Sequence, residues 1–291
     1  MQVRDLVRVL SVKLRQFADP LGPQCVVSCV YGLQLFRPNS MNAEIAEFIS
    51  LITDMILDLG SMGMGLEQDG SSGRMTAQGV AMTMQGLRKM GSDSPESRRL
   101  INALLPYIEP DILLEGEGLS GFEVGIALSG LKHMDVEHSE VRELITSLIA
   151  LLYLPSHNNE LRYKIPDHEL MEYDGIHDRW LLSPAEFGYA LSGMCRLSNQ
   201  DPLVSELFLA TVARLDSARL NEPTPQSVAL AVHGMQNFRI PTRLLNIFEQ
   251  QIKLFEERGE TLSAQGVGML LYGLSKSLST GKSFFTNLIL Q

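Results

Sequence analysis

The chain has 291 residues, of which 45% are hydrophobic and 20% are charged, and its formal net charge is −10. The length fits either two globular domains or one elongated array, and the apolar fraction is ample for a continuous core. The acidic balance excludes nucleic-acid binding that works through overall positive charge. Any nucleic-acid site must therefore depend on a local concentration of basic residues.

Cysteine usage and hydropathy restrict the compartment. The three cysteines Cys25, Cys29 and Cys195 predict reduced thiols, because an odd number in a chain of this length does not suggest a disulfide framework. No N-x-S/T acceptor occurs, so nothing indicates secretion. The longest apolar stretch, 144–154, is far too short to span a membrane, and no membrane insertion is expected.

The first twenty residues have two interpretations. Their basic residues lie on an amphipathic pattern that is also typical of a transit peptide. The apolar spacing favours a helix that packs on the next element as the trailing helix of a preceding repeat. The residues that would form its buried face are Val3, Leu6, Val7, Leu10 and Leu14.

A fifteen-residue segment recurs along the chain, and each copy is an apolar helical run that contains a glycine near its end. The six copies are 22–36, 76–90, 120–134, 183–197, 224–238 and 263–277, with the glycines Gly32, Gly86, Gly130, Gly193, Gly234 and Gly273. In five copies Ser or Thr stands ten residues before the glycine, where its hydroxyl caps a helix start. In three copies proline follows at the first helical position. This pattern predicts one helix, here called helix A, copied six times.

A second amphipathic run follows each helix A after a short polar break, and we call it helix B. Clear examples are 94–108, 139–154, 201–215 and 241–255. One such hairpin cannot bury its apolar face alone, so the sequence predicts a single all-α solenoid over 1–291. It would contain about six helix-turn-helix repeats of roughly 39–44 residues, with helix A on the concave side. Repeats would begin near 22, 76, 120, 183, 224 and 263, with insertions at 60–73 and 155–180.

The repeated glycine needs a reason, because glycine inside a helix costs about 1 kcal/mol relative to alanine. Six such costs imply that something approaches the helix closely at this point. The first explanation is that helix A packs tightly on helix B. The alternative is that the glycine leaves room for the backbone of a ligand.

Two copies carry a resemblance to a known family. The segments SAQGVGMLLYGLSKS (263–277) and CVVSCVYGLQLF (25–36) resemble the octotricopeptide class of algal and organellar helical repeats. The resemblance implies an α-solenoid that binds RNA in a mitochondrion or chloroplast. Without it, a cytoplasmic location would be the expectation.

Charge is distributed unevenly between the helix A segments and the rest of the chain. The six segments carry a net charge of +3 and the remainder carries −13, and the basic residues fall two or three places after the repeat glycine. Stacking would line them up with polar residues of the other copies and with side chains just before the glycine. The predicted ligand-binding stripe is Arg88, Lys89, Lys132, His133, Arg196, Gln236, Asn237, Lys276, Tyr31, Gln85, His233 and Tyr272. Two plainer explanations are that the helix dipole favours cations in a last turn and that polar residues there face water.

Signals for catalysis are weak, so we expect no enzyme, cofactor, metal or small-molecule substrate. Residues 280–283 (TGKS) resemble the end of a phosphate loop, but the first glycine of that motif is replaced by Lys276. Cys25 and Cys29 have no second pair at zinc spacing and are interpreted as small core residues. The histidines and carboxylates of 157–178 are interpreted as a solvated insertion. Two functions remain: binding of single-stranded RNA, or a scaffold that holds protein subunits of a large assembly.

Overall fold

The computed structural model describes residues 3–16, 22–35, 43–61, 76–108, 119–153, 181–215, 223–238 and 240–278. Within these ranges the regular structure is helical, apart from one isolated bridge between Leu182 and Leu215. The predicted all-α class is therefore confirmed for the described part of the chain.

All six predicted copies form helices, and each helix begins one residue after the predicted cap. They are α2 (Pro23–Gly32), α4 (Ala77–Leu87), α7 (Gly121–Ser129), α9 (Pro184–Gly193), α11 (Pro225–Gly234) and α13 (Ala264–Leu278). Short 3-10 turns extend two of them, η1 (Leu33–Leu35) after α2 and η3 (Gly130–His133) after α7. Local capping explains the agreement, because the Thr76 hydroxyl accepts a hydrogen bond from Gly79 N at 3.1 Å.

Two acidic residues of the helix A segments take part in this capping. Glu123 and Glu186 each accept a hydrogen bond from the backbone N–H of their own cap residue, Ser120 or Ser183. The cap hydroxyls accept in return from the backbone N–H of Glu123 and Glu186, which completes two capping boxes. The negative charges in these segments therefore lie at helix starts, away from the basic residues at the helix ends.

The other described helices are helices B, and the first of them is the predicted trailing helix of a preceding repeat. They are α1 (Val3–Arg15), α3 (Ala43–Ser61), α5 (Pro95–Ile108), α8 (Ser139–Tyr153), α10 (Pro202–Ala213) and α12 (Thr242–Arg258). The first of them agrees only in part with its predicted buried face. Val7 is buried and Leu14 packs against the core, whereas Leu6 and Leu10 are exposed.

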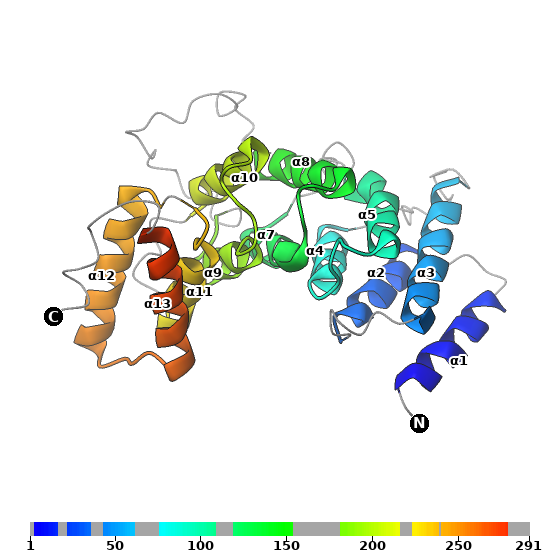
Figure 1. Ribbon diagram of the computed structural model, residues 1–291, viewed down its shortest axis with the longest axis horizontal. Coiled ribbons are helices and arrows are strands. Elements are labelled where there is room, and N and C mark those ends of the chain that lie inside the picture. The colour runs from blue at the N-terminus through cyan, green and yellow to red at the C-terminus, as the bar shows by residue number, and fades with distance from the viewer. Residues whose placement is uncertain are drawn as a thin grey trace.

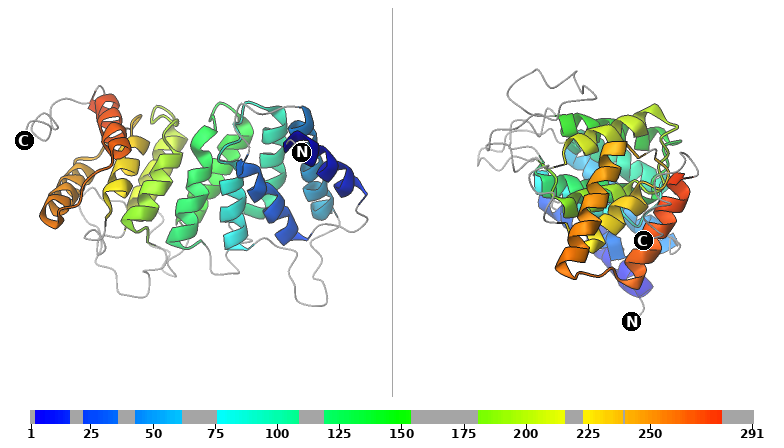
Figure 2. Two further views of the ribbon diagram at one scale, coloured as in Figure 1. Left: turned by 90° about the horizontal axis from the view of Figure 1, so that it is seen from below. Right: turned by 90° about the vertical axis from the view of Figure 1, so that its left-hand side faces the viewer.

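The helices form two rows, which we call row A and row B. In row A each of α2, α4, α7, α9, α11 and α13 contacts the next, and in row B the same holds for α1, α3, α5, α8 and α10. The last helix B, α12, contacts α11. Figure 1 shows a bent array with row B along its outer side and row A along its inner side. The left view of Figure 2 shows that within each row the helices follow one another along the long axis in chain order.

The repeat glycines lie where neighbouring helices A cross. A Cβ on Gly193 would lie 2.0 Å from the carbonyl oxygen of Leu128 in α7, a separation that no real Cβ contact reaches. Four more copies show the same relation at 2.2–2.5 Å: Gly86 on Val30, Gly130 on Met84, Gly234 on Leu191 and Gly273 on Val232. The prediction that the glycine allows close packing is therefore correct, but the predicted neighbour, helix B, is wrong. The close neighbour is the helix A of the preceding repeat, and its backbone fills the space that a ligand backbone would need.

The core lies between the two rows and runs along the array. Its largest fully buried side chains include Phe187 of α9 and Phe238, and the ring of Phe238 stacks on Phe208 of α10 at 4.6 Å. Cys29 packs against this core, but Cys25 is exposed, so its interpretation as a core residue is wrong. None of the described helices combines the length and the apolar character needed to cross a membrane.

Several predicted features fall outside the described residues. The insertion predicted at 60–73 begins inside α3, which runs to Ser61, and its remainder is not described. The same holds for the insertion at 155–180 with its histidines, and for the TGKS segment at 280–283.

Candidate nucleic-acid interface

The predicted stripe lies at the C-terminal ends of the row A helices, where the chain turns towards row B. Arg88 is the C-cap residue of α4, and Lys132 and His133 belong to the 3-10 turn that ends α7. Arg196 follows α9 and is exposed. Because the helices A contact one another in chain order, these turns follow one another along one edge of row A. The basic residues share this edge because they occupy equivalent positions of the repeat.

Three consecutive repeats contribute cations to one electrostatic neighbourhood. Burial lowers the pKa of His133, and the positive charges of Arg196, Lys132 and Arg88 lower it further. The Cys195 thiol lies beside the same charges: burial raises its pKa, and Lys132, Arg196 and Arg88 oppose that rise. We call Arg88, Lys132, His133 and Arg196 the basic cluster.

The cluster holds excess positive charge. Within the described residues no carboxylate forms an ion pair with Arg88, Lys132 or Arg196. Burial, and in addition the positive charges of these three residues, lower the pKa of His133 and so disfavour a further positive charge at this place. An anion placed among them would relieve that repulsion, so the cluster favours a negatively charged ligand.

Hydrogen bonds between neighbouring turns hold this edge in place. Ser92 N donates to the His133 carbonyl at 3.3 Å, and Asp135 N donates to the Ser92 hydroxyl at 2.8 Å. Arg98 donates to the Ser92 carbonyl at 2.8 Å from the first turn of α5. These hydrogen bonds connect the turn after α4 to the turn after α7. They therefore hold the backbone of Arg88, Lys132 and His133 in a defined position.

Two members of the predicted stripe form similar hydrogen bonds between neighbouring repeats. The side-chain amides of Gln236 and Asn237 both donate to the carbonyl of Cys195 in the preceding repeat. Their N–H groups therefore serve contacts between repeats. The Gln236 Oε1 atom is buried and has no hydrogen-bond partner in the described part of the chain.

The remaining stripe residues lie around the cluster. Lys89 and Lys276 are exposed at the ends of α4 and α13, and Tyr31 and Gln85 are half-buried. His233 lies next to Tyr272 with ring centroids 5.9 Å apart. Burial lowers the pKa of His233, and the positive charge of Lys132 lowers it further. Lys132 therefore links the His233–Tyr272 pair electrostatically to the basic cluster.

The structure adds two aromatic side chains that the sequence reasoning missed. Phe122 of α7 is 62% exposed and Tyr189 of α9 is 50% exposed, although both lie in row A. Phe122 stands two residues after the cap Ser120, and Tyr189 stands six residues after the cap Ser183. By helical spacing, both positions share a helix face with the stripe position that directly precedes the repeat glycine. Alignment of the six copies could have found Phe122, because the equivalent residue is Gln in four of the other copies; the position of Tyr189 is mostly apolar and gives no such signal. Exposed aromatic rings are groups on which unpaired bases can stack.

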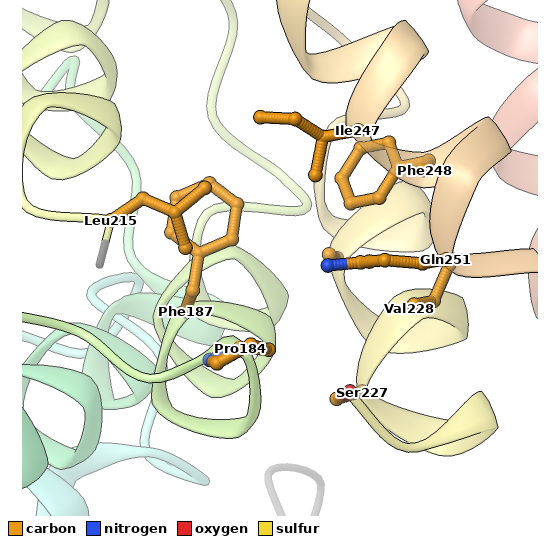
Figure 3. A pocket seen from close by; sticks show the side chains of 9 residues that line it. Pro184, Phe187, Leu215, Ser227, Val228, Ile247, Phe248 and Gln251 are labelled. Atoms are coloured by element: carbon orange, nitrogen blue, oxygen red, sulfur yellow. The ribbon is translucent and has the colours of Figure 1, made fainter. Parts of the chain in front are cut away.

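Two observations on the described residues bear on small-molecule and metal sites. A cavity between α9, α11 and α12 is lined by Phe187, Val228 and Phe248, with Gln251 at its side (Figure 3). Its volume of about 10 Å³ is near the minimum for one water molecule. Across the described ranges, no three His, Cys, Asp or Glu side chains come together as metal ligands would.

Comparison of the chain with protein-family models, curated proteins and solved structures found no match.

Proposed function

We propose that the chain is an α-solenoid of about six A–B repeats that binds single-stranded RNA along row A. The basic cluster is the observation that carries this proposal. It gathers cations from three consecutive repeats in a chain whose net charge is −10, and it has no carboxylate partner among the described residues. Phosphate groups would supply the missing negative charge, because Arg and Lys bind phosphates through charge-assisted hydrogen bonds.

Exposed aromatic rings support RNA over other polyanions. Phe122, Tyr189 and Tyr272 are each at least 50% exposed on row A helices. A single strand presents bases that can stack on such rings while its phosphates contact cations, whereas an acidic peptide has no comparable group. The resemblance to the octotricopeptide class suggests the same function and an organellar location. The proposed role is binding without catalysis.

Fluorescence anisotropy with a labelled single-stranded RNA of mixed sequence tests the proposal. We expect binding that weakens with salt between about 50 and 200 mM. Three phosphate contacts would give a slope of log K against log salt of about −2, since each contact on a single strand contributes about −0.7.

Polyglutamate of similar charge is the matched competitor in this assay. We expect it to displace the RNA poorly, because it offers charge without bases. No binding of RNA at the lowest salt would refute the proposal. Equal competition by polyglutamate would instead favour the second candidate, a scaffold that holds acidic protein segments.

A further inference from the structure

Every contact between neighbouring helices A in the interior of row A has two complementary sides. One side is the repeat glycine of the following helix. The other is an apolar residue that stands two places before the glycine of the preceding helix, and its carbonyl oxygen meets the glycine. In the five copies with a following neighbour this residue is at most 2% exposed: Val30, Met84, Leu128, Leu191 and Val232. The two sides fit one another five times in succession.

At the C-terminal end of row A, the apolar side of this contact is exposed, and no other helix A follows it among the described residues. In α13 the equivalent residue, Leu271, is 49% exposed, and Val267 one turn earlier is 41% exposed. Gly268, between them, has open space where a side chain would point. In the other five copies the residues equivalent to Val267 are at most 2% exposed: Val26, Val80, Val124, Phe187 and Val228. The right view of Figure 2 shows α12 and α13 facing outward at this end.

The N-terminal end of row A presents the glycine side. A Cβ on Gly32 of α2 would meet no atom within 4 Å, unlike the other five repeat glycines. Cys25 is exposed and Cys29 half-buried, and both lie on the face of Gly32 at helical spacing. In all five other copies the residue equivalent to Cys29 is buried: Thr83, Ala127, Ala190, Ala231 and Leu270.

The same end carries apolar side chains of α1 that remain in contact with water. They are between 42% and 47% exposed: Leu6, Val9, Leu10 and Val12. Together with the open face of α2 they give this end an apolar surface of the kind that marks a protein interface.

We propose that a second copy of this chain docks head to tail, so that the Gly32 face of one copy packs on the Leu271 face of another. The contact would continue the five internal contacts of row A across two molecules. Such an interface joins two different surfaces, so a pair of copies keeps one free face of each kind, and association yields open chains or a closed ring. The proposal is independent of RNA binding, because neither face contains a residue of the basic cluster.

Two variants block one face each and leave the interior of the fold untouched. Gly32→Leu adds a side chain where α2 has open space, and Leu271→Lys places a charge on the exposed face of α13. Leu209→Lys on α10 is the matched control, since Leu209 is 48% exposed and lies at neither end. Circular dichroism checks that each variant keeps its helices.

Sedimentation velocity over a concentration series provides the readout. We expect the parent chain and Leu209→Lys to form species of at least twice the monomer mass, and each blocked variant alone to stay monomeric. An equal mixture of Gly32→Leu and Leu271→Lys should form dimers and nothing larger, because one open face of each kind remains. A monomeric parent chain would overturn the proposal, as would assembly of both blocked variants to the parent's extent. A contact between two α13 faces would also overturn it, and would show as normal assembly of Gly32→Leu.

Discussion

Replacing Gly193 by alanine should lower the free energy of unfolding by about 3 kcal/mol, at the upper end of the range for an overpacked core. The added Cβ would lie 2.0 Å from the Leu128 carbonyl oxygen, and backbone cannot move aside as a flexible side chain can. Helices α7 and α9 would have to separate, which would also disturb the turns that carry Lys132 and Arg196. Urea denaturation followed by circular dichroism measures the effect.

Gly268→Ala is the matched control, because Gly268 also lies inside a helix A but has no atom within 4 Å of an added Cβ. We expect it to raise the free energy of unfolding by up to about 1 kcal/mol through helix propensity alone. Equal responses of the two variants would contradict the close packing of neighbouring helices A.

Replacing Arg88, Lys132 and Arg196 together by glutamine should weaken the binding of single-stranded RNA on the order of 100-fold at low salt. Each lost charge-assisted contact contributes about 1 kcal/mol or more, and three such losses give a change of this size. The slope of log K against log salt should become shallower by about 2. Stability should change little, because these cations have no ion-pair partner among the described residues.

A second triple variant removes the same charge from the helices B. Arg99, Arg142 and Lys253 pair with Asp54 on α3, Asp201 at the start of α10 and Glu249 on α12, respectively. Their replacement by glutamine should leave RNA affinity within a few-fold of the parent, because these residues lie outside the basic cluster. The fold should also be kept, since surface ion pairs contribute about 1 kcal/mol or less to stability. An equal loss of affinity in both variants would show that overall charge, and no particular cluster, drives binding.

Helix starts were predictable because their signals are local. The cap at Thr76 and the capping boxes at Ser120 and Ser183 each involve residues within three positions of one another. The repeat strengthened these signals, since the apolar spacing recurs in every copy and a Ser or Thr cap recurs in five of the six. The basic edge was predictable for the same reason, because equivalent positions of stacked repeats must lie side by side.

Contacts between repeats were not predictable from such signals. Glycine spacing showed that something approaches closely, but only the three-dimensional arrangement shows that Gly193 meets α7. The bonds from Gln236 and Asn237 to the Cys195 carbonyl link residues about forty positions apart, and no local pattern encodes them. The exposure of Phe122 and Tyr189 was missed because apolar residues in an apolar helix are expected to be buried.

Photocrosslinking with RNA that contains 4-thiouridine tests the central claim most directly, because it identifies both the ligand and the residues that it touches. We predict crosslinked peptides from the turns after α4, α7 and α9, which carry the basic cluster, and from the row A positions around Phe122 and Tyr189. Peptides from the outer helices α5, α8 and α10 should stay free of crosslinks. Crosslinks concentrated on those outer helices, or none at a salt concentration where RNA binds, would contradict RNA binding along row A.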